Sequence, residues 1–166
     1  MFQVGDKIFY PMHGAGIIEA MEEKEFLGEK HLYFVLHMLL KELDIMVPVE
    51  KMSALGIRSI VDRQTLDEVF AVFHERELDP TVNAAQRFKA NTEKLKSGNI
   101  FEGAEVIRDL QLISKHKILG TSDRNMLDNA MQNLISEIEL VRDMDHEQAT
   151  ELLRQMLSEE DQAVPT

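Results

Sequence analysis

Short apolar segments alternate with turn-forming residues over the first third of the chain. Between residues 2 and 52, runs of β-branched, aromatic and other apolar residues are separated by Gly, Pro and Asp, a pattern typical of strands joined by turns. The segment 31–37 is rich in β-branched and aromatic residues, which indicates a mostly buried strand. The pattern predicts five strands, at residues 2–4, 7–10, 16–20, 32–36 and 43–49.

The last of these strands contains a proline. Because Pro48 has no amide hydrogen to donate, the segment that begins at Asp44 fits an edge strand, or a strand that ends at the proline. An edge strand can accept a strand from a partner protein. We therefore expect this segment to be available for docking.

Helical periodicity replaces the alternation after Gly56. Residues 65–68 fit a capping box, and Leu66, Val69 and Phe73 follow at helical spacing. This first helix is expected to reach Glu77 and to be closed by Asp79-Pro80, with a short linker at 81–83. Further helices are predicted at 84–96 with a C-cap at Ser97-Gly98, from beyond Asn99 to Ile113, over 127–141 after Gly120, and from a capping box at 145–148.

These segments predict an α+β protein in two segregated parts. We expect a small antiparallel β-barrel over residues 1–55, an all-α domain over 56–160 and a frayed tail at 161–166. No apolar run approaches the length of a membrane helix, and the first ten residues lack the features of a signal peptide, so we expect a cytoplasmic protein.

Charge is distributed unevenly along an acidic chain. The formal net charge is -12, which argues against a protein that coats nucleic acid by charge alone. Residues 84–120, however, carry seven basic and four acidic side chains, including the cluster Arg87, Lys89, Lys94 and Lys96. This segment is suited either to a phosphate backbone or simply to a solvated helix face.

The sequence offers little support for catalysis. There is no cysteine, and the six histidines do not fall into metal-binding spacings, so we expect no cofactor, no metal and no small-molecule substrate. The run His13-Gly14-Ala15-Gly16 superficially resembles a phosphate or oxyanion loop. Because strand-like residues follow it, a tight turn is the better interpretation.

Three stretches, taken together, resemble the CarD family of bacterial transcription factors. They are residues 4–19, which contain Val-Gly-Asp-x-x-x-Tyr-Pro-x-His-Gly, then Val47-Pro48-Val49 with Gly56-Ile57-Arg58, and residues 87–91 through 104–110. The first stretch alone is also similar to the polymerase-interacting module of transcription-repair coupling factors. The helical half, with residues 94–98, points to CarD specifically.

The resemblance implies a Tudor-like barrel that docks on the RNA polymerase β subunit mainly by strand pairing. By position, the implied contacts are Lys24, Asp44, Ile45, Met46, Val47 and Pro48. In some relatives an arginine stands where this chain has Met46.

In the family, the helical domain lies at the upstream edge of the transcription bubble, where a tryptophan wedges into the minor groove. This chain has no tryptophan, and Ala84 stands at that position, with Gln86 in place of a neighbouring arginine. The resemblance implies that Arg87, Lys89 and Arg124 contact DNA phosphates, which would position the protein without reading sequence.

Three functions are compatible with these observations. The first is a transcription regulator that docks on polymerase β and modulates the stability of the promoter open complex. The second is a polymerase adaptor that contacts protein only, as the missing tryptophan and the acidic C-terminal helices suggest. The third is an enzyme that uses His13 with a nearby carboxylate, which the absent catalytic motifs disfavour.

Overall fold

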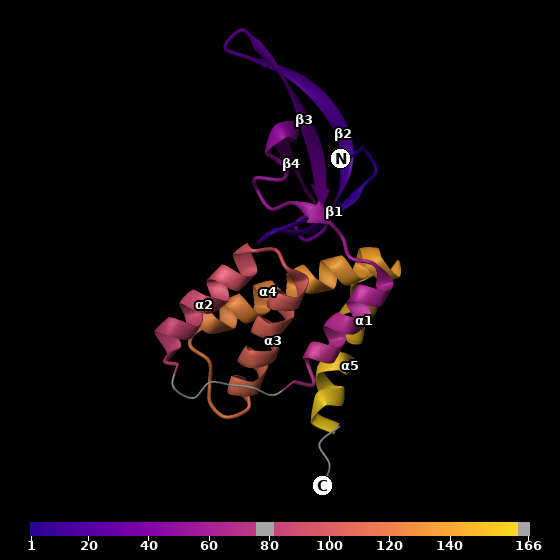
Figure 1. Ribbon diagram of the computed structural model, residues 1–166. Coiled ribbons are helices and arrows are strands. Elements are labelled where there is room, and N and C mark those ends of the chain that lie inside the picture. The colour runs from indigo at the N-terminus through magenta and orange to yellow at the C-terminus, as the bar shows by residue number, and fades with distance from the viewer. Residues whose placement is uncertain (76–81, 163–166) are drawn as a thin grey trace.

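The computed structural model describes residues 1–75 and 82–162. A β-sheet formed by the N-terminal third stands on a layer of helices formed by the rest of the chain (Figure 1). The predicted fold class, α+β in two segregated parts, is confirmed.

The N-terminal part is a five-stranded antiparallel sheet with the strand order β4-β3-β2-β1-β5. The sheet is not closed, because β4 and β5 are its two edges, so the predicted barrel is an open, bent sheet. The strands are β1 (Lys7–Tyr10), β2 (Gly14–Phe26), β3 (Glu29–Met38), β4 (Leu43–Pro48) and β5 (Arg58–Ser59). A 3-10 helix at Val49–Lys51 follows β4.

One predicted strand is wrong, and another was missed. Residues 2–4 form no strand, because Gly5 takes a φ of +96° and the backbone turns there, with the Gln3 amide bonded to the Asp6 carboxylate at 2.8 Å. The fifth strand is instead β5, which pairs with β1. It follows residue 55, so the sheet extends into the segment that was expected to open the helical domain.

A bulge shapes the long strand β2. The register of β2 against β3 shifts between Ile18 and Ala20, which leaves Glu19 as an extra residue. Such a bulge bends the strand and increases its twist, which lets one sheet enclose a core. That core consists of Ile8, Ile18, Phe34, Leu36, Met38, Val47, Met52 and Ile57.

Five helices form the second part. They are α1 (Arg63–Val72), α2 (Ala84–Lys96), α3 (Ile100–Ser114), α4 (Thr121–Arg142) and α5 (His146–Gln162). The 22-residue helix α4 is central and packs against α3, α5, α1 and the sheet. Buried apolar residues of α1, α3, α4 and α5 form a second core beneath the sheet.

The observed ends of α1, α2 and α5 can be compared with the predicted caps. Helix α2 has the predicted bounds, and Gly98 takes a φ of +73° just after it. The capping box of α5 is confirmed, since the Gln148 amide donates to the Asp145 carboxylate at 2.8 Å. The predicted capping box at 65–68 is wrong, because Asp62 is the N-cap and its carboxylate accepts from the Thr65 amide.

Other predicted ends differ as well. Helix α1 ends at Val72, and the predicted end at Glu77 and the closure by Asp79-Pro80 lie outside the described residues. Helix α5 continues to Gln162, so the first two residues of the predicted tail are helical, and residues 163–166 lie outside the described range.

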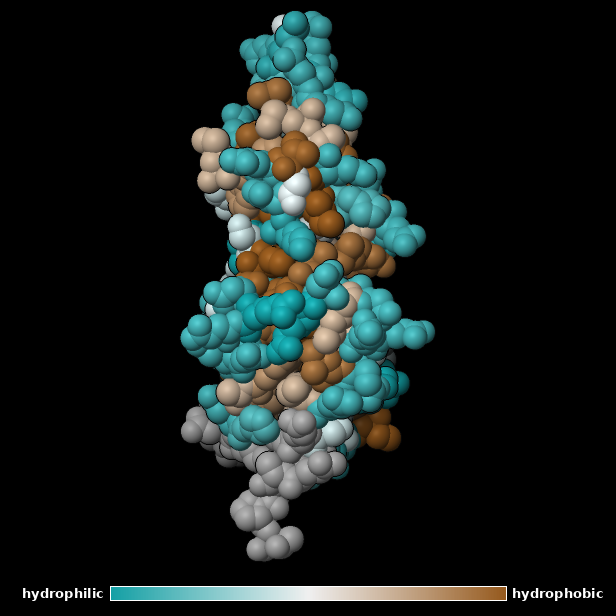
Figure 2. Space-filling view, turned by 90° about the vertical axis from the view of Figure 1, so that its right-hand side faces the viewer, coloured by the Kyte–Doolittle hydropathy of each residue, from teal (hydrophilic) through white to brown (hydrophobic). Residues whose placement is uncertain are grey.

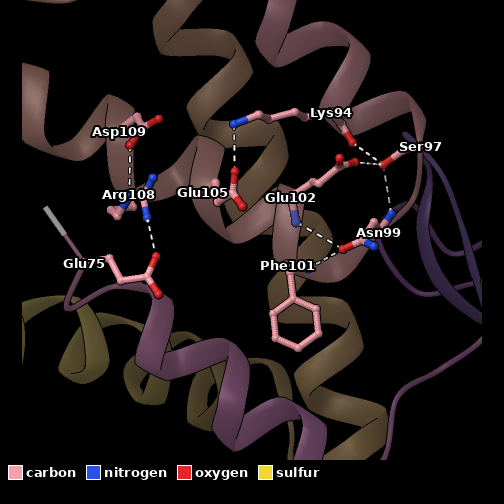
Figure 3. Close-up of polar contacts among 9 residues, drawn as sticks. All are labelled: Glu75, Lys94, Ser97, Asn99, Phe101, Glu102, Glu105, Arg108 and Asp109. Carbon is pink, nitrogen blue, oxygen red and sulfur yellow. Dashed lines mark hydrogen bonds and ion pairs between the residues drawn. The ribbon is translucent and has the colours of Figure 1, made fainter. Parts of the chain in front are cut away.

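Polar contacts fasten α3 to its neighbours (Figure 3). Lys94 of α2 forms an ion pair with Glu105 of α3 at 2.7 Å. Arg108 of α3, which is buried, pairs with Glu75 just after α1 at 3.1 Å and with Asp109 at 2.9 Å. The pairs with Glu105 and Glu75 link α3 to α2 and to the segment after α1, whereas the pair between Arg108 and Asp109 lies within α3.

A buried ion pair joins the sheet to the helices. Glu137 of α4 is fully buried, and both of its oxygens accept hydrogen bonds from the Arg58 guanidinium of β5, at 2.8 and 2.9 Å. One oxygen also accepts from the Val61 amide at 3.0 Å. Arg58 donates in addition to the Gly98 carbonyl at 2.7 Å and covers the ring of Phe9 at 4.5 Å. The two parts are therefore connected by a satisfied charge network.

Close backbone approach supports the same junction. The Ala15 amide donates to the Ser136 hydroxyl at 2.9 Å. A Cβ atom on Gly14, whose φ is +90°, would lie only 2.9 Å from side-chain atoms of Leu40 and Ser136. His13 ends the turn that precedes β2, whereas Gly14, Ala15 and Gly16 are the first residues of that strand, so the predicted turn covers only the start of the His-Gly-Ala-Gly run. Gly14 lets α4 approach the sheet. Figure 2 shows hydrophobic residues gathered where the molecule narrows between its two parts.

Replacing Glu137 should test the junction. We expect Glu137→Gln to lower the free energy of unfolding by about 3 kcal/mol, because Arg58 would keep its charge in a part-buried position without its partner. Urea denaturation followed by circular dichroism measures this change. The matched control is Asp67→Asn, which breaks the ion pair with Arg142. Because the Asp67 side chain is 62% exposed, this change should cost less than about 1 kcal/mol. Equal losses in the two variants would contradict the role of Glu137.

Candidate functional site

The first candidate surface is the free edge of the sheet. Within residues 1–75 and 82–162, strand β4 pairs with β3 on one side and with no strand on the other. Its outer side therefore presents backbone donors and acceptors to a partner strand. Pro48 is its last residue, as predicted, because proline cannot continue the ladder.

Register divides the predicted contact residues of β4 between two faces. Ile45 and Val47 lie opposite Leu36 and Phe34 and pack into the sheet core. Asp44, Met46 and Pro48 are the alternate residues, so their side chains lie on the outer face. A partner on the outer face would contact these three side chains, whereas Ile45 and Val47 offer only their backbone.

Lys24 shares this outer face at a distance from β4. In the β2–β3 hairpin, Lys24 lies opposite His31. The next cross-strand pair on the same face is Glu22 with Tyr33, and Tyr33 also lies opposite Pro48 of β4. Its ammonium lies 3.9 Å from the carboxylate of Glu22, and both side chains are about half exposed. The structure thus places Lys24 on the same face as Met46 and nearer the hairpin tip.

An ion pair stands at the start of β4. The imidazole of His37 lies 2.9 Å from the Asp44 carboxylate. This hydrogen bond, assisted by the charges of Asp44, Glu19 and Glu42, raises the pKa of His37 above its ordinary value of 6.5. Glu19, His37 and Asp44 each offer a ligand atom within 4.8 Å of the others. We assign no metal to this group, because both carboxylates are exposed and the imidazole is already bonded to Asp44.

The second candidate surface is at the start of α2, where the residues expected near DNA lie. Ala84 is exposed in the first turn. Gln86 closes a capping box, with its side chain accepting from the Asn83 amide at 3.2 Å and its amide donating to the Asn83 side chain at 2.8 Å. Gln86 therefore has a structural role that the sequence analysis did not foresee.

The basic cluster of α2 is partly neutralised. The Arg87 guanidinium lies 3.2 Å from the carboxylate of Asp123 in α4, and both side chains are largely buried. Lys94 is held by Glu105. Lys89 is exposed and has no ion pair among the residues that the structure describes. Of the cluster, Lys89 is thus better placed for a phosphate contact than Arg87 or Lys94.

Residues far apart in the sequence meet here. An open hollow of about 470 Å³ is lined by α2, by the α3–α4 connection and by the first turn of α4, including Arg87, Phe88, Lys117 and Ile118. Figure 1 shows this end of the helical domain on the side away from the sheet. Arg124 is exposed in the same turn of α4. Lys117 is the only one of the exposed cations Lys89, Lys117 and Arg124 that is among the residues lining the hollow; we call these three residues together the basic patch.

Sequence analysis missed Lys117 as a member of the basic patch. The excess of basic residues over 84–120 was a signal that included it, but no pattern connected it with α2. The contact became visible only through the packing of α3 and α4, which brings residue 117 beside residue 87.

The pocket beside His13 can be compared with the enzyme hypothesis. The ring of His13 lies 4.4 Å from that of Tyr10, and the pocket that it lines contains Asn129, Gln132 and Asn133. No carboxylate is among the residues lining this pocket within the described parts of the chain. The carboxylate partner that the enzyme hypothesis assigned to His13 is therefore not among these lining residues. Over the described residues, no helix has the length and apolarity to span a membrane.

Models of known protein families match the two parts of the chain. The family model "CarD-like/TRCF RID domain" matches residues 2–61, and "CarD, C-terminal domain" matches residues 68–154. The chain is therefore a transcription factor of the CarD family, with an N-terminal RNA polymerase-interacting domain.

The chain is also similar to two individual proteins. The chain is 47% identical over 148 residues to "Putative transcription factor YdeB" of Bacillus subtilis (strain 168), covering 89% of this chain and 97% of that protein. The solution structure of the 72-residue N-terminal domain of Myxococcus xanthus CarD is 30% identical, with a TM-score of 0.31, over 36% of this chain and 79% of that one.

The ion pair at β4 predicts a pH dependence. Because the pKa of His37 is raised in the folded protein, the pair stabilises the sheet fully below the ordinary pKa of 6.5, and its contribution is lost as pH rises through the folded value. An NMR titration should show that Asp44→Asn returns the pKa of His37 toward 6.5. Glu22→Gln, which removes another carboxylate of the same face, should leave that pKa unchanged. An unaltered pKa in Asp44→Asn would refute the assignment.

Proposed function

We propose that this protein docks on the β subunit of RNA polymerase through the free edge of β4 and modulates promoter open-complex stability through its helical domain. The observation that carries the proposal is the unpaired edge of β4 in a domain that belongs to the polymerase-interacting class. Strand addition uses such an edge, because main-chain hydrogen bonds supply affinity and alternate side chains supply specificity.

The outer face beside this edge supports the same contact. Met46 is 40% exposed, and Pro48 and Tyr33 continue the surface beside it. Asp44 and Lys24 lie at opposite ends of this row. An apolar centre with charged ends is the arrangement expected at a protein interface, where burial of the centre gives affinity and the charged rim gives orientation.

The helical domain supports a contact with DNA backbone rather than with bases. Lys89 and Arg124 are exposed cations, and Arg87 and Gln86 help to hold the segment that carries them. Phosphate contacts position a protein without reading sequence. Held by the polymerase, a weakly basic surface needs little affinity of its own for DNA.

A protein-only adaptor is the second candidate. The observation that favours it is the pairing of Arg87 with Asp123 and of Lys94 with Glu105, which removes two of the four cations of α2 from DNA contact. The net charge of -12 favours it as well. The two candidates differ in whether cations of the helical domain affect the promoter complex.

A substitution on the outer face of β4 tests docking. Met46→Asp should weaken binding to polymerase β roughly tenfold or more, because a charge would replace an apolar side chain at the centre of the contact. Binding is measured by pull-down and titration against isolated β. Val4→Asp is the control, since Val4 is 52% exposed and precedes β1, which is separated from β4 by two strands in the sheet order. If both variants bind as wild type does, docking through this edge is excluded.

A charge reversal tests DNA contact. Lys89→Glu should shorten the lifetime of polymerase–promoter open complexes and lower the salt dependence by about one counterion, with binding to β unchanged. Lys7→Glu, an equal charge change at an exposed residue of β1, is the control. Identical lifetimes for Lys89→Glu and wild type over a range of salt would favour the adaptor.

A further inference from the structure

The methionines of this chain fall into two groups by exposure. The chain has ten methionines and no cysteine, so methionine is its only sulfur-containing residue. Four are exposed, namely Met1, Met12, Met21 and Met46, and the exposed fractions of the last three are 48%, 47% and 40%. The other six are buried or partly buried in the two cores. Sulfur chemistry with a dissolved reagent is therefore concentrated at four positions of the N-terminal part.

Met46 is the exposed methionine at the free edge of β4. It lies opposite Val35 of β3, on the outer face that it shares with Asp44 and Pro48. Val35 is buried, with 8% exposure, so the surface beside the Met46 thioether is apolar. A strand that pairs with this edge would cover Met46 and remove its side chain from water.

The other exposed methionines have different positions. Met21 lies opposite Phe34, a residue of the sheet core, and therefore on the inner face of β2, with β3 between it and β4. Met12 precedes β2 and lines a groove beside Ile45, whose side chain belongs to the inner face of β4. Of the four exposed methionines, Met46 alone thus lies on the outer face of the free edge.

Oxidation of a thioether by a peroxide requires access to the sulfur and no neighbouring acid or base. The sulfur lone pair attacks one oxygen of hydrogen peroxide, the O–O bond breaks, and an S–O bond forms. The departing hydroxide takes the proton from the transferred oxygen and leaves as water, so methionine is oxidised by two electrons and peroxide is reduced by two. Methionine sulfoxide reductases reverse the step with two electrons from thiols, and the oxygen again leaves as water.

We propose that Met46 is an oxidation-sensitive site, at which conversion of the thioether to the sulfoxide by hydrogen peroxide blocks docking on the β subunit and enzymatic reduction restores it. The sulfoxide is a polar, chiral group in place of an apolar one. Its oxygen would lose hydrogen bonds to water when a partner strand covered it, and this loss opposes docking. The inference rests on the proposed function, which places Met46 at the centre of the contact.

Peroxide treatment followed by a binding titration tests the site. The full-length protein is treated with hydrogen peroxide, freed of the oxidant and titrated against isolated β, while mass spectrometry reports the sulfoxide at each methionine. We expect the oxidised protein to bind β roughly tenfold more weakly than the untreated protein. Incubation with methionine sulfoxide reductases A and B and dithiothreitol should restore the binding.

Variants assign the effect to one residue. Met46→Leu has no sulfur at this position, so peroxide treatment should change its own affinity for β by less than about twofold. Met21→Leu is the matched control, because Met21 is as exposed as Met46, and it should lose binding on treatment as the wild type does. Met46→Gln carries a permanent polar group of similar size and should bind β roughly tenfold more weakly without any oxidant.

Four results would overturn the proposal. They are unchanged affinity for β with sulfoxide present at Met46, a loss of binding on treatment that persists in Met46→Leu, wild-type affinity in Met46→Gln, and conversion of Met21 without conversion of Met46. In each case untreated wild-type protein still binds β, so the proposed function stands. Failure of the untreated protein to bind β would refute the proposed function, and this inference with it.

Discussion

The ion pair between Arg58 and Glu137 is the interaction on which the arrangement of both parts depends. A carboxylate with no exposure to solvent is tolerable only when its oxygens are fully bonded, and here a guanidinium and a backbone amide satisfy them. Each charge needs the other, so the sheet cannot turn away from α4 without leaving a buried charge unpaired. The two candidate surfaces, on β4 and at the start of α2, are held in one geometry as a result.

Much of the fold could be predicted from the sequence, and the misses have physical causes. The bounds of α2 and the capping box of α5 follow from local signals, because caps and periodicity act within one turn of chain. The strand expected at 2–4 gave way to a turn at Gly5. Strand β5 has two residues, too few to show alternation, and it exists because β1 offers it a partner. Closure of the sheet depends on whether the edge strands β4 and β5 come close enough to pair, and no local sequence pattern predicts that distance.

The candidate sites could likewise be predicted from the sequence only in part. Pro48 pointed to an edge strand because its missing donor is a property of the residue itself. Which β4 side chains face outward depends on pairing with β3, and the bulge at Glu19 in β2 shows that register cannot be counted from the sequence alone. The pairing of Arg87 with Asp123 joins residues 36 positions apart, so the local excess of basic residues could not show that this charge is already neutralised. The same long-range packing brought Ile118 and Lys117 beside α2.

Helix α4 has a further consequence for how such a protein would find its place on DNA. Arg124 in its first turn and Glu137 at the sheet junction belong to one uninterrupted helix, which separates them by about 20 Å along the axis. That length corresponds to roughly six base pairs of B-form duplex. Anchored on an enzyme at one end, a rigid element of fixed length selects a position on DNA by its distance from the enzyme. The location of the contact would then be encoded in the number of helical turns, and no base sequence would have to be recognised.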